Sequence, residues 1–136
     1  MVGKKAKIIH LITRLDMGGS AQNTLLTALN HDPQRYSVCL IKGSTGESAM
    51  TEAETQLVKD RLADGRKHGV EVIDLPSLVR RISPLNDIKA FISIFRFLRR
   101  SRPDIVHTHT SKAGILGDSN RKRPFGGGPK TWHRTH

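Results

Sequence analysis

A cluster of polar side chains follows a short apolar stretch in the last third of the sequence. The residues after Ile105 and Val106 are His107, Thr108, His109, Thr110, Ser111 and Lys112. Imidazole, hydroxyl and ammonium groups can hydrogen-bond the hydroxyls and phosphate oxygens of a ligand. In open α/β sheets, ligands bind at the carboxyl ends of the strands. The pattern therefore predicts a binding site at a strand end, with His109, Ser111 and Lys112 among its contacts.

A second candidate site follows an apolar stretch near the start of the sequence. Residues 8–13 lead into Arg14, Asp16, Gly18 and Gly19. The glycine pair would let the backbone approach a phosphate, with the amides of the following helix directed at it; an ordinary tight turn is the alternative. Arg14 and Asp16 could hydrogen-bond a sugar or remain solvated. The dinucleotide fingerprint Gly-x-Gly-x-x-Gly is absent.

The two histidines of the first cluster raise the question of a metal site. His107 and His109 are two residues apart, so they face the same side of an extended strand. No carboxylate, cysteine or third histidine lies nearby at a suitable spacing. We therefore predict no metal and expect His107 at the edge of the core. No Ser-His-Asp arrangement or Walker loop supports a hydrolase or a nucleoside triphosphatase.

Alternating strand and helix patterns predict the scaffold of both sites. We expect strands at residues 8–13, 36–41, 70–75 and 105–107, and helices at residues 21–30, 51–68 and 87–100. Ser20 is expected to cap the first helix and Gly69 to end the second. Strands separated by such helices indicate right-handed βαβ units and parallel pairing. The predicted fold class is therefore α/β, a Rossmann-like open parallel sheet with flanking helices.

The helix at residues 87–100 is amphipathic. Its main apolar residues share one face, which is expected in the core: Ile88, Phe91, Ile92, Phe95 and Leu98. Its basic residues lie largely elsewhere: Lys89, Arg96, Arg99 and Arg100. The basic surface could contact anionic lipid head groups, as in a peripheral membrane protein, or simply be solvated.

Composition narrows the class of protein. The 136 residues carry a net charge of +11, so phosphates, anionic lipids and nucleic acid are candidate partners, with a solvated basic surface as the alternative. Nucleic acid is disfavoured because no ladder of aromatic residues accompanies the charges. Cys39 has no partner for an internal disulfide, which fits a reducing cytoplasm. No signal peptide and no run of about 20 apolar residues is present, so we expect a cytoplasmic protein.

The sequence changes character after Gly117. Residues 118–136 have no apolar period and contain three consecutive glycines and a short basic run. We interpret residues 1–117 as the folded domain and residues 118–136 as a basic, glycine-rich tail that is frameshifted or disordered. A one-base shift from Asp118 permits codons for an amphipathic helix end followed by Gly-Val-Pro. The nucleotide sequence would refute this interpretation if the shifted frame held an early stop.

Together these residues resemble the N-terminal, acceptor-side domain of a family 4 (group 1) glycosyltransferase. The resemblance lies in the strand and glycine loop at residues 7–19, the helix start at residues 23–26, and the strand and histidine loop at residues 102–117. It implies a truncated GT-B architecture of two Rossmann-like domains. The implied reaction is the transfer of a glycosyl group from a nucleotide-sugar to an acceptor hydroxyl with retention, without cofactor or bound metal.

The resemblance also assigns residues. Gly18 and Gly19 would lie at the cleft near the donor phosphates, and the acceptor side would comprise Arg14, Asp16, His109, Ser111 and Lys112. The family often has an acidic residue early in the first helix, where this chain has Gln22 and Asn23. A later histidine-rich strand and the donor domain with its paired glutamates are missing, so no residue can be assigned to catalysis.

We therefore interpret the chain as an acceptor-side fragment of a retaining glycosyltransferase, inactive alone, with a polysaccharide or lipid-linked acceptor. The basic surface and the habit of the family favour the inner face of the cytoplasmic membrane. The alternative is a non-catalytic binding module, or a subunit that pairs with a separate donor-domain chain. A basic nucleic-acid binder is a third interpretation, which predicts a steep dependence of affinity on salt.

Overall fold

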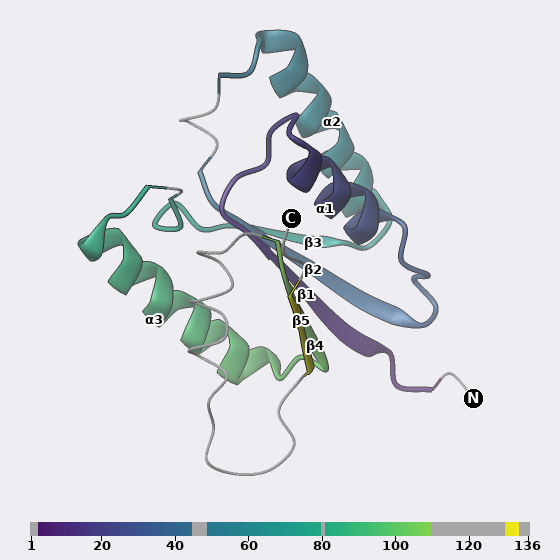
Figure 1. Cartoon of the computed structure of the whole chain (residues 1–136). Coiled ribbons are helices and arrows are strands. Elements are labelled where there is room, and N and C mark those ends of the chain that lie inside the picture. Colours follow the sequence, from purple (N-terminus) through teal and green to yellow (C-terminus); the bar gives the residue numbers. More distant parts are fainter. Residues whose placement is uncertain (1–2, 45–48, 80, 110–129, 134–136) are drawn as a thin grey trace.

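A five-stranded parallel sheet forms the centre of the chain (Figure 1). The computed structural model describes residues 3–44, 49–79, 81–109 and 130–133. The strands are β1 (Ala6–Ile12), β2 (Tyr36–Lys42), β3 (Glu71–Asp74), β4 (Ile105–Thr108) and β5 (Lys130–His133). Their order is β3-β2-β1-β4-β5, and every neighbouring pair is parallel. The predicted Rossmann-like fold class is confirmed.

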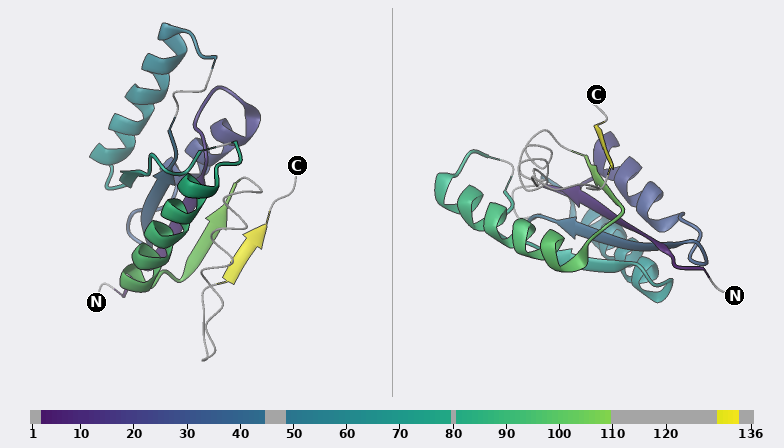
Figure 2. Two further views of the ribbon diagram at one scale, coloured as in Figure 1. Left: turned by 90° about the vertical axis from the view of Figure 1, so that its left-hand side faces the viewer. Right: turned by 90° about the horizontal axis from the view of Figure 1, so that it is seen from below.

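Helices cover both faces of the sheet. The helices α1 (Gly19–Leu29) and α2 (Glu52–Lys67) lie on one face, and α3 (Pro84–Ser101) lies on the other (Figures 1 and 2). The residues of β1 alternate between these two layers, as the period of a strand requires. Ile12 packs with α1 and α2, whereas Ile9 and Leu11 pack with α3. His10 therefore faces the layer of α1 and α2.

The helix boundaries confirm one capping prediction and contradict another. Thr51 caps α2 through a reciprocal pair of hydrogen bonds with Glu54, and Gly69 follows the helix with φ of 88°. In α1 the N-cap is Gly18, so the prediction that Ser20 caps the helix is wrong. The chain enters the helix two residues earlier than expected. The hydroxyl of Ser20 donates instead to the carbonyl of His109, at 2.9 Å.

The orientation of α3 differs from the prediction. Ala90 and Ile94 are its buried residues, and they pack against Ile9 and Leu11 of β1. Ile88 and Ile92, which were expected in the core, are 58% and 48% exposed. We attribute the rotation to the small side chain of Ala90, which lets the helix approach the branched residues of the sheet closely. The helix also begins three residues earlier than predicted, with Pro84 in its first turn.

Part of the predicted tail belongs to the sheet. The sequence interpretation placed no element within residues 118–136, yet residues 130–133 form β5 and pair with β4. Residues 110–129 and 134–136 lie outside the described part of the chain, so the division at residue 117 stays a prediction. Over the residues that are described, no helix is both long enough and apolar enough to span a lipid bilayer.

Candidate functional site

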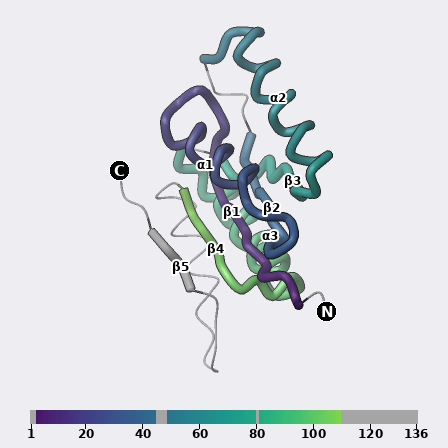
Figure 3. The backbone as a smooth tube through the Cα atoms, turned by 90° about the vertical axis from the view of Figure 1, so that its right-hand side faces the viewer, coloured from purple at the N-terminus to yellow at the C-terminus, as the bar shows by residue number. Residues whose placement is uncertain are grey.

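The carboxyl ends of β1 and β4 form the switch point of the sheet. β1 lies between β2 and β4 in the sheet. Strands β1 and β4, which are far apart in the sequence, therefore run side by side (Figure 3). The connection from β1 to β2 passes through α1 on one face, and the connection from β3 to β4 passes through α3 on the other. In an open parallel sheet, connections that leave in opposite directions create a crevice outside the strand ends, and ligands bind there.

The two candidate loops meet at this edge. The hydroxyl of Ser20, next to Gly19, donates to the carbonyl oxygen of His109 at 2.9 Å. The amide of His109 donates to the carbonyl of Leu11 at 3.0 Å. The glycine-rich loop after β1 and the histidine-bearing loop after β4 are therefore in direct contact, as their positions after parallel strands predicted. Both polar groups of the His109 main chain are bonded, so its Cα has a defined position.

The glycine-rich loop is braced by its own charged residues. Arg14 Nη2 lies 2.6 Å from Asp16 Oδ2, and the amide of Gly18 donates to Asp16 Oδ1 at 2.8 Å. A Cβ at position 18 would lie 2.8 Å from the same oxygen, whereas a Cβ at Gly19 would meet no atom within 4 Å. A side chain at position 18 would therefore require the Asp16 carboxylate to shift. Asp16 shapes the loop, and contacts of Arg14 and Asp16 with a ligand stay a prediction.

Gln22 connects this loop to the helices. Its Nε2 donates to the carbonyl of Asp16 at 3.0 Å, and its Oε1 accepts a hydrogen bond from Arg61 of α2. Gln22 stands where the resembled family often has an acidic residue. In this chain the amide supplies both a donor and an acceptor, so one side chain holds the loop against α2.

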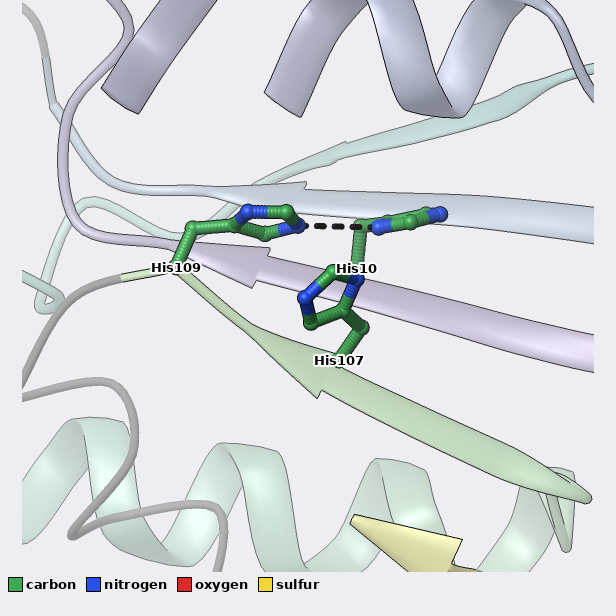
Figure 4. Close-up of side chains that lie close together, drawn as sticks. All are labelled: His10, His107 and His109. Carbon is green, nitrogen blue, oxygen red and sulfur yellow. Dashed lines mark hydrogen bonds between the residues drawn. The ribbon is translucent and has the colours of Figure 1, made fainter. Parts of the chain in front are cut away.

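A cluster of histidines lies beside the meeting point of the two loops. In the parallel pairing of β1 and β4, His10 stands directly opposite His107, and His109 lies two residues further on the same face. His10 Nδ1 is 3.0 Å from His109 Nε2, and His10 Nε2 is 3.1 Å from Nε2 of His31, which follows α1. Figure 4 shows the rings of His10, His107 and His109 directed toward one another.

Burial keeps two of these imidazoles neutral over a wide pH range. His10 is 1% exposed, and desolvation, followed by repulsion from His109, His107 and His31, lowers the pKa of His10 to about 2. Desolvation and then repulsion from His107 lower the pKa of His109 to about 3. Burial also lowers the pKa of His31. A neutral imidazole has one N–H and one lone pair, so the rings can pair without any charge.

Sequence reasoning missed His10 and His31. Both residues are far from His107 and His109 along the chain, so no local spacing connects them. The missed signal was a polar residue inside the apolar run of the first strand. A strand order that places the first strand beside the fourth would have brought His10 next to His107. Of the predicted contacts, Ser111 and Lys112 lie outside the described residues, so their roles stay predictions.

Comparison with known proteins finds a bacterial glycosyltransferase that is similar in sequence to part of the chain. No family model matches the chain. The UDP-Gal:alpha-D-GlcNAc-diphosphoundecaprenol alpha-1,3-galactosyltransferase of Escherichia coli is 45% identical to it over 56 residues, which are 41% of this chain and 14% of that protein. Among solved structures, the apo form of the lipopolysaccharide outer core galactosyltransferase WaaB covers 85% of this chain and 29% of its own, with a TM-score of 0.49 and 17% identity. The sequence match confirms the resemblance to bacterial glycosyltransferases.

Proposed function

We propose that this chain is the acceptor-side part of a retaining glycosyltransferase of GT-B architecture. The whole enzyme would move a sugar from a nucleotide-sugar to a lipid-linked or polysaccharide acceptor. The observation that carries the proposal is the 45% identity over 56 residues to the galactosyltransferase of Escherichia coli. That protein's name specifies a UDP-galactose donor and an acceptor sugar on diphosphoundecaprenol. The two loops that meet at the switch point support the proposal, because ligands of such sheets bind there.

The residues of the crevice divide between the two substrates in this proposal. The loop of Gly18 and Gly19 lies beside the donor phosphates, and Arg14, Asp16 and His109 face the acceptor, with Ser111 and Lys112. At neutral pH the lowered pKa of His109 keeps its imidazole uncharged. Neutral His109 can accept a hydrogen bond from a sugar hydroxyl, which an imidazolium cannot do.

The proposed chemistry requires a second part. The diphosphate that leaves the sugar carries a growing negative charge, and groups placed to stabilise that charge supply much of the rate enhancement. We assign those groups to a donor-binding part, so this chain alone binds acceptor but does not transfer sugar. The nucleotide-sugar is a substrate, and the proposed transfer uses no cofactor and no metal.

Binding of an acceptor to the full chain tests this proposal directly. The probe is N-acetylglucosamine diphosphate on a short, water-soluble prenyl chain, measured by calorimetry in the presence of a metal chelator. We expect saturable binding that His109→Ala weakens by about tenfold, the loss of one good hydrogen bond to a charged or polar ligand. His68→Ala, at the end of α2, is the matched control and should bind like the wild type. Absence of binding, or equal weakening by both substitutions, would reject the proposal.

Addition of a donor-binding part separates the two arrangements of the enzyme. With the separately produced donor half of the Escherichia coli galactosyltransferase, we expect transfer of labelled galactose from UDP-galactose to the same acceptor. Transfer by the mixture supports a two-part enzyme. Acceptor binding without transfer by any mixture would instead favour a non-catalytic binding module.

The outer surface of α3 supports a membrane contact in the same function. Leu85, Ile88 and Ile92 are 75%, 58% and 48% exposed on this surface. The exposed basic residues of the same helix are Lys89, Arg96, Arg99 and Arg100. Apolar side chains flanked by cations suit the boundary between acyl chains and anionic head groups. We propose that this surface rests on anionic lipid at the inner face of the cytoplasmic membrane, where a lipid-linked acceptor would be present.

Vesicle binding tests the lipid contact. Each Lys or Arg near an anionic membrane contributes about 1 kcal/mol, so the double change Arg96→Gln and Arg100→Gln should lower the partition coefficient about 30-fold. The matched control, Lys59→Gln with Lys67→Gln, removes the same charge from α2 on the opposite face. Co-sedimentation with phosphatidylglycerol vesicles measures both variants. Equal losses in the two double variants, or equal binding of the wild type to neutral vesicles, would contradict the proposed surface.

A further inference from the structure

We propose that His10, His107 and His109 together form a binding site for one divalent transition-metal ion of the zinc class. His10 and His107 lie on the paired strands β1 and β4, His109 directly follows β4, and each side chain offers a ring nitrogen. These nitrogen atoms all lie within 4.8 Å of one another. This inference does not rest on the proposed sugar transfer, which does not use the ion. The site is an additional property of the crevice.

The sheet holds the three ligands in place before any ion binds. His10 and His107 are register partners in the β1–β4 pair. His109 extends this pairing by one step, because its amide donates to Leu11. The Ser20 hydroxyl bonds the His109 carbonyl from the opposite loop. Ligands fixed on paired strands lose little conformational entropy on binding, which favours a metal over the same residues on mobile loops.

The separations suit a small ion. Zinc binds imidazole nitrogen at about 2.0–2.1 Å, so two nitrogens of a tetrahedral site lie about 3.4 Å apart. His10 Nδ1 and His109 Nε2 are 3.0 Å apart, slightly closer than that value. The remaining pairs lie within 4.8 Å. Small rotations of the rings, which already point toward a common centre in Figure 4, would equalise these distances.

The ligand chemistry selects the class of metal. Three imidazoles without a carboxylate suit Zn²⁺, Cu²⁺ and Ni²⁺, whereas Mg²⁺ and Ca²⁺ prefer oxygen ligands. Zinc sites with three protein ligands keep a fourth position for water or an anion.

His31 completes the arrangement as an outer partner. If His10 binds the ion through Nδ1, its proton must be on Nε2, which lies 3.1 Å from His31 Nε2. His10 can then donate to His31, whose ring in turn packs against Tyr36 at 5.5 Å between centroids. Metal-binding histidines almost always donate their second ring N–H to such a partner, and loss of the partner lowers affinity about 10- to 100-fold. His31 is therefore a positioning residue in this proposal.

Direct metal titration of the full, chelator-treated chain tests the site. Co²⁺ binding is followed by its visible absorption bands, and Zn²⁺ binding by competition with a chromophoric chelator. We expect one ion per chain and the intense bands of four-coordinate Co²⁺. His107→Gln and His109→Gln should each lower the affinity by about 100-fold or more, and His31→Gln by about tenfold. The control His68→Gln should bind like the wild type.

Measurements on the wild type keep the test decisive if a variant fails to fold. In ¹⁵N-labelled protein, Zn²⁺ should shift the resonances of His10 Nδ1 and His109 Nε2 and leave those of His68 unchanged. The proposal is overturned by any of three results: equal loss of affinity in His68→Gln, several weak sites per chain, or no shift of the His10 and His109 nitrogens. None of these readouts depends on sugar transfer, so failure here leaves the proposed function untouched.

Discussion

Acid should destabilise the fold through His10, and the size of the effect follows from its burial. In the folded chain the pKa of His10 is lowered to about 2, whereas the imidazole of an unfolded chain has the ordinary value of 6.5. Between these two pKa values the imidazole of His10 is protonated in the unfolded state and neutral in the folded state. A lowered folded-state pKa contributes stability that is fully present above pH 6.5 and is lost as the pH falls below it.

The expected loss can be calculated for a mildly acidic buffer. Each pH unit below the unfolded pKa costs about 1.36 kcal/mol until the folded group begins to protonate. Between neutral pH and about pH 5, His10 therefore removes about 2 kcal/mol from the free energy of unfolding. A folded-state pKa of about 3 in place of about 2 leaves this figure unchanged, because both values lie well below the assay pH. His109 adds a loss of similar size and the same sign, since its pKa is lowered to about 3, which also lies well below the assay pH.

Urea unfolding at about pH 8 and about pH 5, with a chelator present, measures the effect. The quantity of interest is the change in unfolding free energy between the two pH values. We expect this change to be about 2 kcal/mol smaller in His10→Gln than in the wild type. Ile9→Val is the matched control: it lies one residue away in β1, is fully buried and has no titrating group. Ile9→Val should be about 1 kcal/mol less stable than the wild type at both pH values, because the loss comes from one buried methylene group. The reasoning is refuted if His10→Gln and the wild type lose equal stability in acid.

Three further predictions concern the neighbourhood of the site. Gly43→Ala should destabilise the fold by about 3 kcal/mol in urea unfolding, because its Cβ would lie about 2 Å from the carbonyl oxygens of Leu78 and Thr13; wild-type stability would contradict this close approach. Burial raises the pKa of the Cys39 thiol to about 12, so at pH 8 a thiol reagent should label it about 1,000-fold more slowly than a free thiol; fast labelling without urea would show that the β2 core is open. Ser20→Ala should cost about 1 kcal/mol through its lost hydrogen bond to the second loop, and an unchanged midpoint would contradict that contact.

The sequence predicted those features of the scaffold that depend on residues close together along the chain. Gly69, which ends α2, was predicted because its signal lies within one helical turn, whereas the capping pair of Thr51 and Glu54 was not predicted. The parallel direction of the strands β1 to β4 follows from the helices that connect them. The rotation of α3 was not predictable in this way. Either Ile88 or Ala90 could face the sheet, and the packing of the whole helix against β1 determines that Ala90 is the buried one.

The candidate site was only half predictable for a related reason. His109 and Gly19 were found because each follows an apolar strand, which is a local property of the sequence. The partnership of His10 with His107 depends on the register between two strands far apart in the chain. The spacing of residues along the sequence does not determine that register. The strand at residues 130–133 was missed because its flanking residues carry no apolar alternation.

The pairing of β1 with β4 has a consequence for the order in which the molecule folds. The contacts that close this edge join residues very distant in sequence: Lys7 with Asp104 is separated by 97 positions, and His10 with His109 by 99. Such contacts form late, because a long loop must close before they gain anything. The β1–β2–β3 layer, by contrast, can assemble from nearer segments. The cluster of His10, His107 and His109 can therefore form only after residue 109 has left the ribosome.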